Sequence, residues 1–305
     1  MPRAEPFDVY LVGRYFCDLV FTQLPELPRL GHEVYAREFH LLPGGVATPA
    51  IALTRLGLRV AWPCIFGSDV FSQHIKSLIM DEKVDPSFFT DSNQPSLRIS
   101  VAFSFEDDRA FLSYIDPLPD LAHASLIRQT KPTWLYITNL LTGENLDELV
   151  RAGREAGSHI FIDCQAHQYK LSNPQVMKAL RSVDVFSPNM EEARILTGEQ
   201  DTKKVLGMLS ELTETVIIKQ GANGCVCRQR GTTVQVDGIP ARIVDTTGAG
   251  DNFNCGFLFA QIKGYSLADS LRIANICGGL SVQGYGGSST SPTRQQISAL
   301  LKNNS

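Results

Sequence analysis

The chain has 305 residues, of which 43% are hydrophobic and 20% are charged, and its formal net charge is −4. This length is enough for one large α/β core with a small lobe, and thus for an enzyme. The acidic balance leaves no basic stripe for phosphate backbones or anionic lipids, so we expect no binding to nucleic acid or membranes. No signal peptide or membrane-spanning run is apparent. Seven scattered cysteines predict reduced thiols in a cytoplasmic protein.

The first third of the chain predicts one buried strand and a small β lobe. Residues 8–13 form a short apolar run that ends in glycine, which is typical of a buried strand. Apolar and polar residues alternate through 33–41, as expected of exposed or half-covered strands. Residues 97–105 and 110–115 have the same character. These segments predict a small β-sheet formed by about 15–42 and 97–116.

The rest of the chain alternates between strand and helix patterns. Expected strands are 60–66, 133–137, 160–163, 184–189 and 216–219, and expected helices are 44–57, 72–80, 145–156, 191–198 and 271–282. This rhythm predicts a parallel sheet with right-handed crossovers and helices on both faces. We therefore expect a single α/β domain over 1–305, with the small β-sheet attached to it.

The most informative stretch is a glycine-rich turn between an apolar run at 243–244 and a helix-period pattern at 253–260. It reads Asp245-Thr246-Thr247-Gly248-Ala249-Gly250-Asp251-Asn252-Phe253. The pattern predicts a strand, a tight turn and the start of a helix. Backbone N–H groups in such a turn point into one concavity, and the helix dipole adds positive charge there, so a phosphate is the natural occupant. Asp251 either begins a helix or faces that anion.

Two common nucleotide-binding motifs do not explain this turn. The P-loop pattern Gly-x4-Gly-Lys-Ser/Thr is absent, and Gly248-Ala249-Gly250 lacks the third glycine of a dinucleotide fingerprint. The whole stretch instead resembles the C-terminal signature of the ribokinase-like carbohydrate kinase family. The resemblance covers nearly the entire chain and implies a three-layer ribokinase-like fold. It also implies that Asp251 is the catalytic base and that the N–H groups of Gly248, Ala249 and Gly250 form an anion hole.

The resemblance extends to the expected acceptor site near the N-terminus. Gly13 and Asp18 have the Gly-x4-Asp spacing with which the family ends its first strand, and this implies that Asp18 binds a sugar hydroxyl. Phe16 stands where many relatives have Asn. Gly44-Gly45 followed by a small-residue helix ending Arg-Leu-Gly resembles the family's N-terminal signature. Gly44, Gly45 and Thr48, at the family's Asn position, are thus expected substrate contacts, although Thr48 also suits a plain helix cap.

Further matches concern the nucleotide and metal ions. Asn189 and Glu192 resemble the Asn-x-x-Glu motif that holds water around Mg²⁺, although a capped helix start explains the same residues. The resemblance also implies ATP contacts and a monovalent-cation site such as one for K⁺. The expected ATP contacts are Asn189, Lys219, Gly221, Gly224, Thr246 and Asn275, and the expected cation site comprises Asp245, Gly286 and Thr290.

The resulting hypothesis is an ATP- and Mg²⁺-dependent kinase acting on a hydroxyl of a small sugar of the fructose, ribose or 2-keto-3-deoxygluconate type. A nucleoside kinase is an alternative because Tyr15 and Phe16 could stack a base. A phosphosugar kinase is weakened by Val46 and His167, which stand where a Lys and an Arg would be expected. A sugar or nucleotide sensor and a dehydrogenase are hypotheses from different functional classes. The small β-sheet is expected to act as a lid over the sugar, and its edge could form a homodimer.

Overall fold

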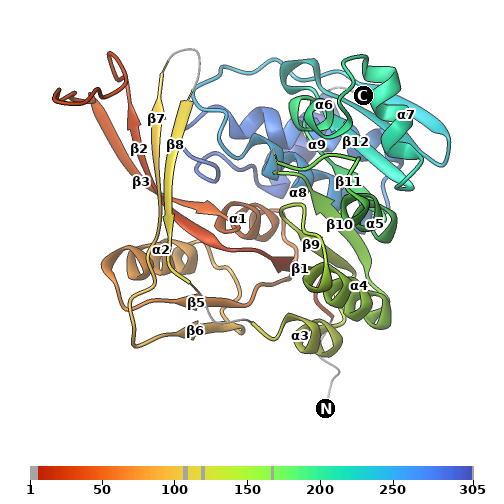
Figure 1. Cartoon of the computed structure of the whole chain (residues 1–305), viewed down its shortest axis with the longest axis horizontal. Helices are drawn as coiled ribbons and strands as arrows, with labels where there is room; N and C mark the ends of the chain where they lie inside the picture. Colours follow the sequence, from red (N-terminus) through yellow and green to blue (C-terminus); the bar gives the residue numbers. More distant parts are fainter. Residues whose placement is uncertain (1–5, 106–108, 118–120, 166–167, 304–305) are drawn as a thin grey trace.

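A computed structural model describes residues 6–105, 109–117, 121–165 and 168–303. Its centre is an eight-stranded sheet with the order β14-β13-β12-β11-β10-β9-β1-β4 (Figure 1). The strands from β12 to β4 are parallel, whereas β13 and β14 run antiparallel at one edge. The bounds are β1 Val9–Val12, β4 Val60–Ala61, β9 Trp134–Ile137, β10 His159–Asp163, β11 Val185–Ser187, β12 Thr215–Lys219, β13 Cys225–Gln229 and β14 Thr232–Val236.

Helices cover both faces of this sheet, which confirms the expected three-layer α/β architecture. One face carries α1 (Ala47–Arg55), α8 (Ala249–Ile262) and α9 (Leu267–Ser281), and its core continues into α2 (Val70–Asp81) and α10 (Arg294–Asn303). The other face carries α3 (His123–Thr130), α4 (Glu144–Ala156), α5 (Pro174–Ser182), α6 (Met190–Thr197) and α7 (Thr202–Ser210).

The central strands supply both hydrophobic cores because successive side chains point to opposite faces. In β1, Val9 and Leu11 belong to the core beneath α1 and α8, while Tyr10 and Val12 belong to the core beneath α3 and α4. A strand buried on both faces needs apolar residues at every position, which explains why residues 8–13 read as a continuous apolar run.

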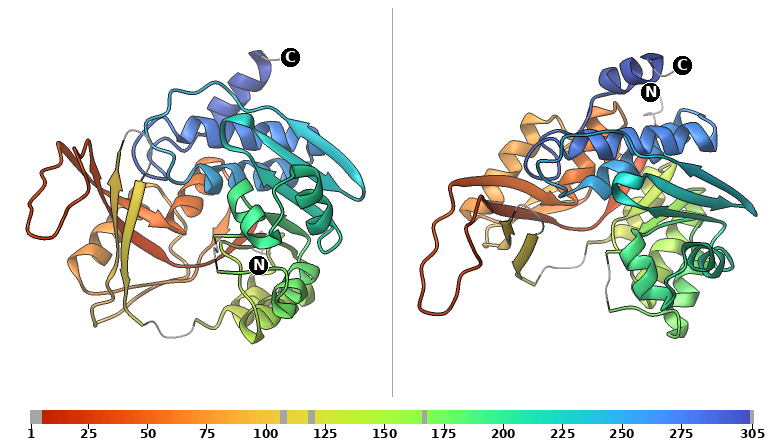
Figure 2. Two further views of the ribbon diagram at one scale, coloured as in Figure 1. Left: turned by 45° about the horizontal axis from the view of Figure 1, so that its top comes forward. Right: turned by 90° about the horizontal axis from the view of Figure 1, so that it is seen from above.

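A second sheet has the strand order β3-β2-β7-β8. It consists of β2 (Tyr15–Thr22), β3 (Glu38–Gly45), β7 (Arg98–Ser104) and β8 (Arg109–Ile115), and a short parallel pair, β5 (Cys64–Phe66) and β6 (Phe89–Asp91), lies beside it (Figure 1). The connection between β2 and β3 projects away from the body of the protein (Figure 2). The start of β2 therefore lies next to the core, while the far end of β2 and the start of β3 extend away from it.

Three details of the expected secondary structure are wrong. The strand expected over 33–41 begins only at Glu38, and the strand expected over 60–66 is divided between β4 and β5, which lie in different sheets. Residues 243–244 form no strand: Ile243 is 62% exposed, and the N–H groups of Val244 and Asp245 donate to the carbonyl of Val282 at the end of α9. Apolar character alone does not distinguish a helix-capping segment from a strand.

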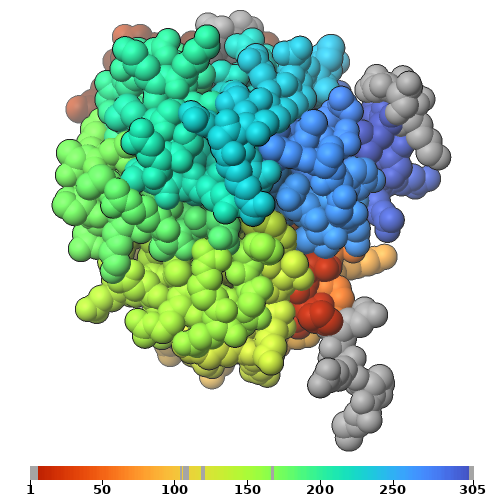
Figure 3. All heavy atoms as spheres, turned by 90° about the vertical axis from the view of Figure 1, so that its right-hand side faces the viewer, coloured from red at the N-terminus to blue at the C-terminus, as the bar shows by residue number. Residues whose placement is uncertain are grey.

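The side of the molecule that faces away from the second sheet is formed mainly by later segments of the chain, coloured from yellow-green to blue (Figure 3). Among the described residues, no helix is both long enough and apolar enough to span a membrane.

Candidate active site

The glycine-rich turn leads into α8, whose N-cap is Gly248 with a φ of 70°. A Cβ atom on Gly248 would lie 2.4 Å from the Cα of Gly287, so both the backbone angle and the close approach require glycine. No side chain caps this helix start. The Ala249 N–H donates to the Thr246 carbonyl at 3.3 Å. The N–H groups of this first turn lie at the positive end of the helix dipole, where an anion is favoured.

Asp251 lies in the first turn of α8, next to these N–H groups. Burial raises the pKa of its carboxyl to about 7, and Asp163 contributes to the rise, while the nearby Lys219 ammonium acts in the opposite direction. A carboxyl group with a pKa near the working pH is well matched to accepting a proton from a hydroxyl group.

Lys219, the last residue of β12, supplies a positive charge at the same place. Its Nζ would lie 3.2 Å from a Cβ on Gly250, and it forms an ion pair of 2.9 Å with Oδ1 of Asp163. Burial lowers the pKa of Lys219, but Asp163 and Glu192 more than offset this, so the net pKa is raised and the side chain is an ammonium. The start of α8 thus has backbone N–H groups and a cation beside it.

Asp18 lies on β2 and is 7% exposed. A Cβ on Gly44 would lie 2.0 Å from its Oδ2, so the carboxylate rests on the Gly44 backbone, where only glycine fits. Burial and the charge of Asp245 raise the pKa of Asp18 to about 7. Among the described residues the Asp18 carboxylate has no hydrogen-bond or ion-pair partner, and a buried group of this kind is a strong candidate for binding a ligand.

A cavity of about 930 Å³ opens in front of Asp251. Phe16 and Gly45 line it, and so does Ile115 from the end of β8. Polar residues that the sequence reasoning missed also line it, namely Arg14, Thr138, Asn139, Asn145 and Gln165. Gln165 has a φ of 40°, an unusual backbone conformation for a residue with a side chain, and such residues gather at functional sites. The cavity can hold a small polar molecule against Asp251.

The suggestion that Tyr15 stacks a base is wrong. Tyr15 is 1% exposed, stacks on Phe66 and donates a hydrogen bond of 2.9 Å to Ser72. It points to the face of β2 opposite Phe16 and Asp18, because side chains alternate along a strand.

Thr48 lies within α1 and is 2% exposed, and the N-cap of that helix is Val46, so Thr48 is no helix cap.

Asn189 and Glu192 form a capping box at the start of α6. Oδ1 of Asn189 accepts from the Glu192 N–H and Oε2 of Glu192 accepts from the Asn189 N–H, both at 2.8 Å. The charge of Glu192 also acts on Lys219 and Asp251. The residues therefore serve as a helix start, as the simpler interpretation holds, and Glu192 lies within electrostatic reach of Lys219 and Asp251.

The residues expected to contact ATP lie in several separate segments. Gly221 begins a 3-10 helix (Gly221–Asn223) one residue after β12, and Gly224 is its C-cap. The amide of Asn275 donates to the carbonyls of Val236 and Asp237, each at 3.1 Å, and thereby fixes the end of β14. Thr246 is exposed in the turn before α8.

The structure brings Asp245 and Gly286 together, since the Gly286 N–H donates to Oδ2 of Asp245 at 2.8 Å. The Thr290 hydroxyl donates to the carbonyl of Ser281 at 2.7 Å. The amide of Asn252 donates to the carbonyls of both Gly248 and Gly287, at 2.9 and 2.7 Å. This amide therefore joins the glycine-rich turn to the 284–291 loop.

The same loop is also held by the first half of the chain. Arg55, at the end of α1, donates from Nη1 to the carbonyls of Ser288 and Ser291, both at 2.9 Å, and pairs with Glu82 at 2.6 Å. The loop beside the start of α8 is thus anchored from a helix more than two hundred residues earlier.

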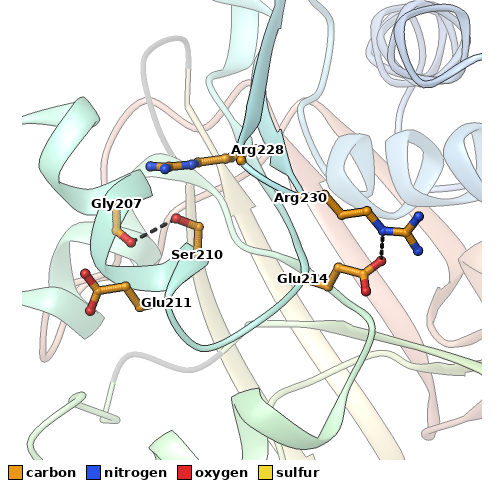
Figure 4. A pocket seen from close by; sticks show the side chains of 7 residues that line it. Gly207, Ser210, Glu211, Glu214, Arg228 and Arg230 are labelled. Carbon is orange, nitrogen blue, oxygen red and sulfur yellow. Dashed lines mark hydrogen bonds and ion pairs between the residues drawn. The ribbon is translucent and has the colours of Figure 1, made fainter.

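A smaller hollow of about 220 Å³ lies between α7 and the start of β14 (Figure 4). Arg230 and Glu214 form an ion pair of 2.9 Å at its side. None of the expected site residues lines it. His167, expected to depart from an Arg position, lies outside the described residues.

Comparison with known proteins identifies the family. The model of the pfkB family carbohydrate kinases matches residues 8–294. A ribokinase from Haemophilus influenzae is 26% identical, with 96% of this chain and 97% of that protein covered. Arabidopsis thaliana ribokinase complexed with ribose and ATP superposes with a TM-score of 0.82 at 23% identity, covering 98% and 99% of the two chains. A putative ribokinase II from E. coli in complex with ATP and Mg²⁺ gives 0.78 at 20% identity, covering 97% and 99%. The chain belongs to the pfkB family of carbohydrate kinases, which are phosphotransferases with hydroxyl acceptors.

Proposed function

We propose that this protein transfers the γ-phosphoryl group of ATP to a hydroxyl group of a small sugar. The observation that carries the proposal is the position of Asp251, which lies in the first turn of α8, a helix start without a side-chain cap, and lines the 930 Å³ cavity. A sugar in the cavity would have a base on one side of its hydroxyl and an anion hole on the other.

In this reaction Asp251 accepts the hydroxyl proton as the sugar oxygen forms a bond to the γ-phosphorus. The bond from phosphorus to the β–γ bridging oxygen breaks, and ADP leaves with that electron pair. The N–H groups of Gly248, Ala249 and Gly250, with the Lys219 ammonium, stabilise the negative charge on the transferred group. Asp18 accepts a hydrogen bond from another hydroxyl and so orients the sugar, with Gly44, Gly45, Thr48 and Phe16 forming the adjacent wall.

Asn189 and Glu192 fit an outer-shell role toward Mg²⁺. Within the described residues no group of three or more His, Cys, Asp or Glu side chains could hold a metal ion directly. One carboxylate and one amide can still hold the waters of an ion that binds chiefly through phosphates, and Mg²⁺ keeps most of its waters. When bound, the ion would neutralise charge on the β- and γ-phosphates.

The remaining assignments follow the same arrangement. Lys219, Gly221, Gly224, Thr246 and Asn275 contact ATP, and the loop of Asp245, Gly286 and Thr290 takes a monovalent cation such as K⁺. Support for the cation comes from the Asp245 carboxylate, which is 6% exposed and accepts the Gly286 N–H from the same loop. Replacing K⁺ with the larger tetramethylammonium ion in the assay should lower kcat, and an unchanged rate would count against this site.

A sugar of the ribose, fructose or 2-keto-3-deoxygluconate type is the proposed acceptor. A nucleoside is the second candidate, favoured by Phe16 in the cavity wall. A direct test is ADP production from Mg-ATP over a panel of pentoses, hexoses, keto acids, nucleosides and sugar phosphates, with Asp251→Asn as the control. One strong acceptor, silent in the control, would support the proposal. ATP binding without turnover of any acceptor would favour a sensor.

The second sheet fits the role of a lid, since Ile115 at the end of β8 lines the cavity. A homodimer through this sheet is part of the proposal. Edge strand β8 exposes 67% of Leu112 and 57% of Tyr114, and an exposed apolar edge is suited to pairing. Sedimentation of Leu112→Asp would test it, with a dimer expected only for the wild type.

All seven cysteines are buried thiols, which suits the proposed cytoplasmic location.

A further inference from the structure

Beneath the anion hole, three neighbouring parallel strands end in polar residues. The last residues of β10, β11 and β12 are Asp163, Ser187 and Lys219. Asp163 and Ser187 are 2% and 0% exposed. Loops that follow strands such as β10, β11 and β12 normally lie at the surface. The ends of these three strands instead form a buried polar cluster, which α8 covers.

Asn254 of α8 is the residue that covers the cluster, and it is 0% exposed. Its Oδ1 accepts from the Ser187 hydroxyl at 2.8 Å, and its Nδ2 donates to Asp163 at 2.7 Å and to the Tyr136 oxygen at 3.1 Å. Both ends of the amide are therefore fixed by the sheet. Since Asn254 follows Asp251 by three residues, it shares the same side of the helix. Fixing Asn254 fixes the rotation of α8 and with it the direction of Asp251.

Asp163 connects Asn254 to Lys219. Its Oδ1 accepts from Lys219 at 2.9 Å and from the Cys164 N–H at 2.8 Å, while its Oδ2 accepts from Asn254. The Lys219 ammonium consequently has Asp163 as its carboxylate partner. A buried ammonium without that partner would turn to the nearest remaining carboxylate, because an unpaired charge in the interior is costly.

We propose that Asp163 and Asn254 are positioning residues that hold Asp251 and Lys219 on separate sides of the anion hole. They keep the base free for the acceptor hydroxyl and the ammonium free for the transferred group. This inference deepens the proposed function and rests on it for its catalytic meaning. Neither residue touches the reacting atoms, so their effect passes through Asp251 and Lys219.

The charged groups around Asp251 make the proposal testable. Asp163, Glu192 and Asp18 raise the pKa of Asp251 beyond the effect of burial, whereas Lys219 lowers it. Asp163→Asn removes one negative charge and releases Lys219 toward Asp251, and both changes lower that pKa. Among these four charged groups only Lys219 lowers the pKa of Asp251, and Lys219→Met removes its charge. The two variants should therefore move the acid limb of the kcat profile in opposite directions.

The experiment measures kcat against pH at saturating Mg-ATP and acceptor. We expect Asp163→Asn to move the acid limb down by about 1 pH unit or more and to lower the plateau kcat by ~10–100-fold, the range for a displaced general base. Lys219→Met should move the limb up, and the double variant should lie between the single variants. Thr213→Val is the matched control, since it removes a buried 2.7 Å hydrogen bond at the opposite end of β12.

A second readout does not need activity. The difference in the free energy of unfolding between Asp251→Asn and its parent changes with pH as Asp251 ionises. The midpoint of this change can be compared in the wild-type and Lys219→Met backgrounds without ATP. Midpoints that coincide, or acid limbs that match the control, would overturn the positioning role. If wild type phosphorylates no acceptor but the midpoints differ, the proposed function fails and the network assignment stands. Lys219→Met keeps the test valid even if Asp163→Asn does not fold.

Discussion

Replacing the expected base by its neutral isostere should make the protein more stable while it abolishes turnover. Burial raises the pKa of Asp251 from the usual 3.8 to about 7. A carboxyl with a raised folded-state pKa binds its proton more tightly in the folded state. Its contribution to stability is fully present below pH 3.8, is lost as the pH rises toward 7, and is constant above that. Asp251→Asn has no carboxyl to ionise at this position, so it does not lose this contribution to stability between pH 3.8 and about 7.

The size of the effect follows from the same two values. The interval from 3.8 to about 7, at about 1.4 kcal/mol per pH unit, gives an upper limit of ~4 kcal/mol. Water entering the cavity screens the charge, so we expect the stability advantage of Asp251→Asn to grow by about 1–4 kcal/mol between pH 4 and pH 8. kcat should fall by at least ~10²-fold with little change in the KM for ATP.

Urea unfolding followed by the fluorescence of the buried Trp62 and Trp134 measures this advantage. Glu211→Gln, an isosteric change at an exposed carboxyl, serves as the control for the change of side chain. An advantage for Asp251→Asn that stays constant or shrinks from pH 4 to pH 8 would refute the buried-carboxylate reasoning. Near wild-type turnover in the same variant would refute its role as the base.

Three further predictions concern the glycines and the second carboxyl. Gly44→Ala should raise the acceptor KM at least ~10-fold with the ATP KM unchanged, because its Cβ would lie 2.0 Å from Asp18; isothermal titration with each ligand separates the two effects. Gly248→Ala should lower kcat and leave acceptor binding intact, since a φ of 70° and the nearby Gly287 exclude a side chain; retained kcat would contradict this. Acceptor binding to wild type should weaken as the pH falls through 7, where Asp18 gains a proton, and Asp18→Asn should bind weakly at every pH.

The order of helices and strands was predictable because local periodicity determines it. Residues 8–13 and 216–219 are apolar at every position, and the glycine-rich turn before Asp251 is recognisable from composition alone. The error at 243–244 arose because an apolar pair can cap a helix as readily as it can extend a sheet. The role expected of Tyr15 was wrong because proximity in sequence to Asp18 does not reveal which face of the strand a side chain occupies.

The charged partners of the site could not be predicted because they depend on how strands meet in space. Asp163 and Lys219 are separated by 56 positions and come together only because their strands end at the same edge of the sheet. Asn254 carried one weak signal, its position three residues after Asp251 on the same helix. Arg14 and Asn139 became part of the site only through the cavity between the second sheet and α3 and α4.

The anchoring of the 284–291 loop by Arg55 has a consequence for biosynthesis. Asp18 and Arg55 are synthesised before Asp251 and the loop beside it. A nascent chain therefore contains the residues proposed to bind the acceptor before it contains the proposed base. Contacts over more than two hundred residues also close slowly, so activity should appear only after the two halves have docked.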